Sequence, residues 1–132
     1  MTPRAVPAHE ADEWVPRIGW HLEQFAASGA ATAADFIADI MDRQRQLWVV
    51  DDDGAVACVL LTSVAVDRFN TVQVTHCAGR NYEDWLHLWP VIEGWAREIG
   101  AGRIEVTARR GWERPLRKFG LAPTHTVLEK RL

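Results

Sequence analysis

Apolar and polar residues alternate along the middle of the chain, and this pattern predicts β-strands. The segment 46–66 contains two β-rich runs separated by Asp-Asp-Asp-Gly, a tetrapeptide typical of a hairpin turn. A third run, 71–79, alternates strictly, so that Val72 and Val74 are expected on one face and Cys77 on the other. The three aspartates of the turn are consecutive and point in different directions, so we expect no metal site there.

Apolar residues recur at helical spacing before and after these strands. Thr32 and Asp35 have the spacing of a capping box, which marks the start of one helix. Pro90 falls in the middle of the longest apolar stripe, where it is expected to kink the helix. The predicted helices span residues 8–29, 33–44, 82–100 and 112–119.

Three further strands complete the predicted pattern. Residues 1–7 contain two prolines, which limit this strand to the edge of a sheet. Residues 103–108 and 124–131 are the other two, and the strand–helix–strand crossover over 71–107 is expected to be parallel and right-handed. The sequence therefore predicts one α/β domain, residues 1–132, with a mixed, mainly antiparallel sheet and helices on both faces.

Composition and charge narrow the class of protein. The net charge is −3 at pH 7 and the pI is about 5.9, which disfavours a general attraction to nucleic acid. No run of about eighteen apolar residues occurs, so no membrane span is expected. Cys58 and Cys77 lie in apolar runs, and we expect each to be a small buried hydrophobe. The seven tryptophans are expected to fill a small core or, alternatively, to form part of a surface for a partner.

The order of these elements resembles the GNAT (Gcn5-related N-acetyltransferase) superfamily. The stretch LRKFGL at 116–121 is similar to the signature that ends the short helix of that superfamily. The resemblance covers most of the chain and implies a site built around the fourth strand. In enzymes of the superfamily, the fourth strand and the helix after it bind the pyrophosphate of an acyl-CoA. The fifth strand, the short helix and the last strand complete the site. Acetyl-CoA is therefore the donor that the resemblance implies.

The pyrophosphate loop of the superfamily has the form Gln/Arg-x-x-Gly-x-Gly/Ala, whose glycines let backbone N–H groups approach the phosphates. The corresponding stretch here is AGRNYEDWL. With Arg80 at the first position, Glu83 and Trp85 stand at the two glycine positions. A carboxylate at the start of a helix stabilises the helix but opposes a bound anion. If acyl-CoA is bound at all, Arg80, Asn81 and Tyr82 are the residues expected to contact it.

The catalytic positions of the superfamily also differ in this chain. A tyrosine of the short helix usually acts as general acid, preceded by a small residue and an asparagine. Leu116, Trp112 and Arg109 hold these positions here. Leucine cannot donate a proton, so no catalytic residue is expected. If the chain is active, His76 and Glu105 are the candidate bases.

The chain departs from the superfamily pattern both in the pyrophosphate loop and at the catalytic positions. The sequence therefore predicts a non-catalytic GNAT-fold protein that binds other proteins and needs no cofactor. The chain resembles the GNAT-like proteins of tailed phages and prophages. That resemblance implies a virion or assembly role, phage proteins as partners, and a location in the host cytoplasm or the particle. The alternative is an acetyl-CoA-dependent N-acetyltransferase with a divergent pyrophosphate loop. Tryptophan and arginine are favoured interface anchors, and the interface candidates are Trp112, Arg109, Arg110, Arg114, Arg117 and Lys118.

Overall fold

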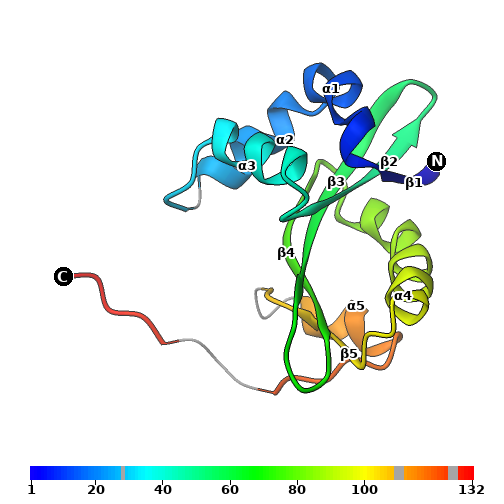
Figure 1. Ribbon diagram of the computed structural model, residues 1–132, viewed down its shortest axis with the longest axis vertical. Helices are drawn as coiled ribbons and strands as arrows, with labels where there is room; N and C mark the ends of the chain where they lie inside the picture. The colour runs from blue at the N-terminus through cyan, green and yellow to red at the C-terminus, as the bar shows by residue number, and fades with distance from the viewer. Residues whose placement is uncertain (28, 109–111, 125–127) are drawn as a thin grey trace.

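The computed structural model describes residues 1–27, 29–108, 112–124 and 128–132. Five strands form one sheet in the order β1-β2-β3-β4-β5 (Figure 1). The first four are antiparallel, whereas β5 runs parallel to β4. This arrangement confirms the predicted mixed, mainly antiparallel sheet with β1 at its edge. The strands are β1 (Thr2–Val6), β2 (Gln46–Asp52), β3 (Ala55–Ala65), β4 (Thr71–Gly79) and β5 (Arg103–Val106).

Helices cover both faces of this sheet, as predicted (Figure 1). Alternation along β2 divides the core, because Val49 packs under the N-terminal helices while Trp48 and Val50 pack under the later ones. Within the described residues, no helix is long and apolar enough to cross a membrane. One face carries η1 (Ala8–Glu10), α1 (Ala11–Trp14), η2 (Val15–Arg17), α2 (Gly19–Ala27) and α3 (Ala33–Met41); the other carries η3 (Tyr82–His87), α4 (Trp89–Glu98) and α5 (Glu113–Arg117).

The start of α3 confirms the predicted capping box. The Thr32 hydroxyl accepts a hydrogen bond from the Asp35 N–H at 3.2 Å, and the Asp35 carboxylate accepts one from the Thr32 N–H at 2.8 Å. Two donors that the helix leaves unpaired are thereby satisfied. These hydrogen bonds hold the pKa of Asp35 below its ordinary value.

We expect Thr32→Ala to lower the free energy of unfolding by about 1 kcal/mol, because the cap of α3 is lost. Urea unfolding followed by tryptophan fluorescence measures the change. The matched control is Thr2→Ala on the edge strand, where the side chain is exposed and has no capping role. A loss of the same size in both variants would contradict the capping argument.

Two predicted helices are divided in the structure. The 82–100 segment forms η3 and then α4, and Pro90 lies in the first turn of α4 rather than in its middle. A proline is tolerated there because its missing N–H would have had no partner within the helix. In the 8–29 segment, Pro16 likewise lies at the start of η2, which separates α1 from α2. The single kinked helix predicted around Pro90 was therefore wrong.

The predicted last strand, 124–131, is also not borne out by the described residues. Thr124 and residues 128–132 are not part of a strand, and residues 125–127 lie outside the described part. Figure 1 shows the C-terminal end running away from the body of the protein, and Leu128 is 91% exposed. Strand propensity reflects how well a side chain packs on a sheet. Residues of high strand propensity therefore form no strand when they have no sheet to pack against.

Candidate functional site

A β-bulge in β4 interrupts its pairing with β3. Leu61 of β3 lies opposite His76, while Thr62 lies opposite Val74, so Thr75 is the extra residue. A bulge bends its strand and interrupts the ladder. On the other side of β4, the pairing with β5 ends at Val74, whose carbonyl accepts from the Thr107 N–H at 3.2 Å. From Thr75 to Gly79, β4 has no paired neighbour on that side among the described residues.

A cavity of about 470 Å³ occupies the space where β4 and β5 separate. This volume lies within the range of about 300–1,000 Å³ that is typical of small-molecule sites. No Asp, Glu, Lys or Arg is among the described residues that line it. The lining residues are Trp20, Gln24 and Phe25 of α2, Cys58 and Leu60 of β3, residues 74–79 of β4, Asn81, Trp85, Trp89, Ile92, Val106, Thr107, Ala108, Trp112 and Leu116. We call this space the β4–β5 cleft.

Three tryptophans form one wall of the β4–β5 cleft without filling it. Trp85 and Trp112 meet edge to face with ring centroids 5.1 Å apart, and Trp89 stacks on Phe119 at 5.5 Å. Trp85 and Trp89 are buried, and neither indole N–H has an acceptor among the described residues. Of the seven tryptophans only Trp20, 38% exposed, presents a large surface. Most of the tryptophans are therefore core and cleft residues, and not a surface for a partner.

The junction between β4 and η3 does not fit a diphosphate. The Asn81 side chain already accepts from the Glu83 N–H at 3.5 Å, and its carbonyl accepts from the Asp84 N–H at 3.1 Å. The Arg80 guanidinium lies over the Trp20 ring at 4.2 Å. The side chain of Tyr82 lies outside the described part. The junction thus has carboxylates and a self-satisfied cap, as predicted, where an anion would need free N–H groups.

Gly79 has a structural explanation of its own. A Cβ atom at this position would lie 2.9 Å from the carbonyl oxygen of Ala57 on β3. Real Cβ atoms essentially never approach a backbone oxygen so closely. The glycine before the junction is therefore required by the close approach of β3, and it is no sign of a phosphate loop.

The structure places His76 in the lining of the β4–β5 cleft. Its Nδ1 lies 2.9 Å from the Thr75 hydroxyl, and its ring packs against Phe25 and Phe36 with centroids 5.2 and 4.8 Å away. Burial, and then the nearby Arg45 guanidinium, lowers the pKa of His76 below its ordinary 6.5. The imidazole is therefore neutral at pH 7, which is the form that a general base needs.

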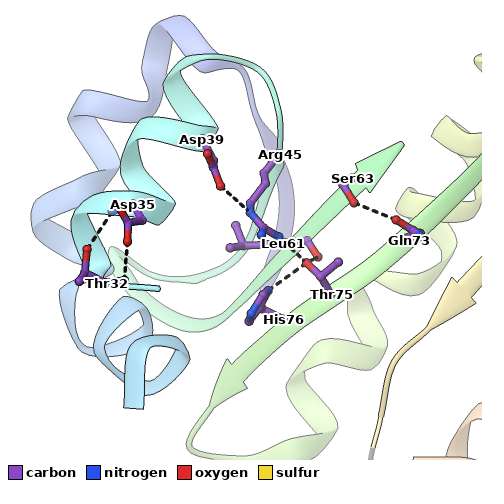
Figure 2. Close-up of polar contacts among 9 residues, drawn as sticks. All are labelled: Thr32, Asp35, Asp39, Arg45, Leu61, Ser63, Gln73, Thr75 and His76. Carbon is purple, nitrogen blue, oxygen red and sulfur yellow. Dashed lines mark hydrogen bonds and ion pairs between the residues drawn. The ribbon is translucent and has the colours of Figure 1, made fainter. Parts of the chain in front are cut away.

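The tautomer of His76 depends on the single hydrogen of the Thr75 hydroxyl. This oxygen accepts from Arg45 at 2.9 Å and lies 3.3 Å from the Leu61 carbonyl, to which it donates (Figure 2). Because the Thr75 hydroxyl donates its hydrogen to the Leu61 carbonyl, it can only accept from His76. The His76 Nδ1–H therefore donates to Thr75, and Nε2 carries a lone pair. No described residue forms a hydrogen bond with that Nε2, so it is the atom that can receive a proton.

The other predicted site residues are divided between the cleft and the rest of the molecule. Glu105, the second candidate base, does not line the cleft; its carboxylate pairs with Arg103 at 3.2 Å. Leu116 does line the cleft and is buried, so an aliphatic side chain occupies the place of the general acid. Trp112 belongs to the cleft wall and is only partly exposed. Arg114, Arg117 and Lys118 are exposed, and Arg109 and Arg110 lie outside the described residues.

The bulge also corrects two predictions on β4. Strict alternation placed Cys77 and Val74 on different faces of the sheet, but the extra residue puts both side chains on the same face. On that face the Sγ of Cys77 lies 3.8 Å from the Sγ of Cys58. Cys58 is buried as expected, whereas Cys77 is exposed in the cleft. Sequence reasoning missed this thiol pair because the pattern of β4 contains no signal for the bulge at Thr75.

The free energy of unfolding is expected to fall as the pH decreases through about 6.5 and below. Burial, and then Arg80, lowers the pKa of His21, just as burial and Arg45 lower that of His76. The unfolded chain, with ordinary histidines, therefore binds protons before the folded chain does, and folding is weakened in that window.

Urea unfolding at about pH 7 and about pH 5 measures this slope. We expect the His21→Gln/His76→Gln variant to have a shallower slope, and the exposed His9→Gln control to keep the slope of the wild type. An equal slope in all three proteins would contradict the assignment.

Comparisons with known proteins identify the fold but no sequence family. No family model matches the chain. No curated protein matches it by sequence. Solved structures do match over essentially the whole chain, and eight of them are 9–14% identical to it in sequence.

Three of these structures illustrate the match. A ribosomal-protein-alanine N-acetyltransferase from Brucella melitensis superimposes with a TM-score of 0.72 at 14% identity and covers 100% of both chains. The glucosamine-6-phosphate N-acetyltransferase of Arabidopsis thaliana gives 0.72 at 11% identity, covering 98% of this chain and 97% of that one. An aminoglycoside N-acetyltransferase in complex with CoA gives 0.71 at 11%, covering 99% and 98%. The chain therefore has the fold of the GNAT acetyltransferases.

Proposed function

We propose that the chain binds an acyl thioester in the β4–β5 cleft and transfers the acyl group to an amine. The observation that carries this proposal is the separation of β4 from β5 after the Thr75 bulge, with an open cavity of about 470 Å³ between them. Similar structures are named as N-acetyltransferases, and one of them was solved with CoA. This proposal favours the alternative interpretation of the sequence over the non-catalytic one, because the tryptophans leave the cleft open.

The cleft suits the uncharged part of a thioester donor. Among the described residues no strand pairs with the cleft side of β4 from Thr75 to Gly79, and an extended ligand with amide groups can pair with such an edge. The described lining carries no formal charge, and the β4–η3 junction does not fit a diphosphate. The donor is therefore held through its amide arm and its acyl group, and a nucleotide contributes little to its affinity.

His76 supplies the proton acceptor in this proposal. The amine nitrogen attacks the thioester carbonyl, the carbon–sulfur bond breaks, and the proton lost by the amine passes to Nε2 of His76. The sulfur leaves as a thiolate and takes its proton from water, because Leu116 has none to donate; the protonated His76 then returns its proton to the hydroxide so formed. A free thiol has a pKa of about 8.5, so a thiolate is a tolerable leaving group without a general acid.

The direct test is titration with acetyl-CoA and with acetyl-pantetheine, followed by an assay of thiol release with a polyamine, an amino sugar and a peptide N-terminus as acceptors. Saturable binding of a thioester together with acceptor-dependent thiol release supports the proposal. Absence of binding for both donors overturns it. His76→Gln should lower kcat by about 10²-fold or more with little change in KM, whereas His9→Gln, an exposed substitution far from the cleft, should leave both unchanged.

A non-catalytic, protein-binding role in phage particles is the second candidate function. It is favoured by Leu116 in place of an acid and by the exposed cations Arg114, Arg117 and Lys118 on and beside α5. Copurification with assembled particles would support this role, and recovery of the protein only as free chain would count against it. Exchange of these three cations for glutamate should then release the protein from particles while leaving thioester titrations unchanged.

A further inference from the structure

The two cysteines of the chain meet in the wall of the β4–β5 cleft. Cys58 lies on β3 and Cys77 on β4, and their Sγ atoms are 3.8 Å apart. Leu60 pairs with Cys77 and Cys58 pairs with Gly79, so the two cysteines are diagonal neighbours on one face of an antiparallel pair. They share that face because of the Thr75 bulge, which separates Val74 from Cys77 by one extra residue.

The two thiols differ in access. Cys58 is 1% exposed, whereas Cys77 is exposed and lines the cavity. The hydrogen bond between the thiols, and then burial, raises the pKa of Cys58 above its ordinary value. Both cysteines line the cavity, but a reagent entering the cleft meets the exposed Cys77 first, because Cys58 presents almost no surface.

The local backbone permits the sulfurs to close the remaining distance. A disulfide needs about 2.05 Å between sulfurs, so the pair must approach by roughly 2 Å. The ladder between β3 and β4 is already irregular at Thr75, two residues before Cys77, and β4 has no described neighbour on its cleft side from there on. β3 and β4 stay paired at these residues, so the approach is a local twist of β4 against β3, which breaks no pairing with β5.

We propose that Cys77 is a thiol-modification site that reacts with low-molecular-weight disulfides, and that Cys58 is its resolving thiol. In the first step the Cys77 thiolate attacks a disulfide RS–SR, forming Cys77–S–SR and releasing RS⁻. In the second step the Cys58 thiolate attacks the Cys77 sulfur, forming the Cys58–Cys77 disulfide and releasing the second RS⁻. Both thiols lose a proton to solvent, and the small disulfide is the oxidant that is reduced to two thiols.

This inference stands apart from the proposed acyl transfer, because it depends only on the positions and access of the two sulfurs. The product crosslinks β3 to β4 at the cleft wall and removes the free thiol from the cavity. Any ligand that fills the cleft should shield Cys77 and slow the first step. Disulfide exchange therefore also reports whether the cleft is occupied.

The test uses the full chain, oxidised glutathione as the probe, and intact mass as the readout. The wild type should end as a species that has lost two hydrogens and carries no glutathione. The Cys58→Ala variant should stop at a stable glutathione adduct on Cys77. Its matched control, Cys77→Ala, should form an adduct at least about tenfold more slowly, because the remaining thiol is buried.

Three results would overturn the proposal: a wild type that keeps its glutathione adduct, a wild type that does not react, or a Cys77→Ala variant that reacts as fast as Cys58→Ala. Thermal melting of each variant shows that the fold is retained. In urea both single variants should react at similar rates, since unfolding exposes either thiol. A difference that persists in urea would mean that burial is not the cause, which also counts against the proposal.

Discussion

Tryptophan in place of Ala108 is expected to abolish binding of acetyl-CoA and acetyl-pantetheine. Ala108 follows β5, lines the β4–β5 cleft and is itself exposed, so an indole there can occupy the cavity without disturbing the core. We expect Kd to rise by about 100-fold or more, equivalent to a loss of about 2.8 kcal/mol of binding free energy. Isothermal titration of the wild type and the variant with both donors measures the effect.

The matched control is Ala34→Trp, the same substitution at an exposed position of α3 outside the cleft. This variant should bind both donors as the wild type does. If Ala108→Trp binds donors with unchanged affinity while remaining folded, the donor site is elsewhere and the assignment of the cleft is wrong. The Ala108→Trp variant should also slow the reaction of Cys77 with oxidised glutathione, because that thiol lines the same cavity.

Phe36→Ala is expected to lower the free energy of unfolding by about 3–5 kcal/mol, the usual cost of emptying a buried aromatic site. Phe36 is 2% exposed and packs edge to face against Phe25 at 5.7 Å and against His76 at 4.8 Å. The Arg45 guanidinium lies 5.4 Å from the ring centre. The variant therefore loses core packing and also hydrates His76, so the pKa of that histidine should rise toward its ordinary value.

Urea unfolding at about pH 7 measures the loss of stability. The matched control is Phe69→Ala, because Phe69 is 47% exposed in the turn between β3 and β4. Its cost should stay below about 1 kcal/mol. Equal costs at the two positions would show that α3 does not contribute to the core in the way the contacts indicate.

Several elements could be predicted because their signals are local. The hairpin of β2 and β3 follows from two β-rich runs around a turn, and Gly54, with a φ of 94°, occupies the left-handed conformation that the turn needs. The start of α3 follows from Thr32 and Asp35 three residues apart. The parallel alignment of β5 with β4 follows from the helical crossover that connects the two strands. In each case the conformation depends on residues of one continuous segment, so it can be predicted from the sequence.

The candidate site was less predictable, because it depends on a register. His76 was recognised as a candidate base from its residue type and strand. The alternation of β4 placed Cys77 on the wrong face, since one extra residue at Thr75 reverses every side chain after it. Glu105 was the weaker candidate base in the sequence, and in the structure it pairs with Arg103 and does not line the cleft. The sequence identified these residues as candidates, but it could not predict the side of the sheet on which each side chain lies.

The sequence by itself determined the strands of the hairpin, the capped helix α3, the apolar stripe of α4, and the absence of a proton donor at Leu116. These features depend on residue type and on spacing within one segment. Only the tertiary structure decided that β4 bulges at Thr75, that β4 and β5 part to leave a cavity lined by tryptophans, and that Cys58 and Cys77 meet in its wall. The physical reason is that a cavity and a cross-strand pair are properties of the space between elements, and the register that sets this space depends on both partners at once.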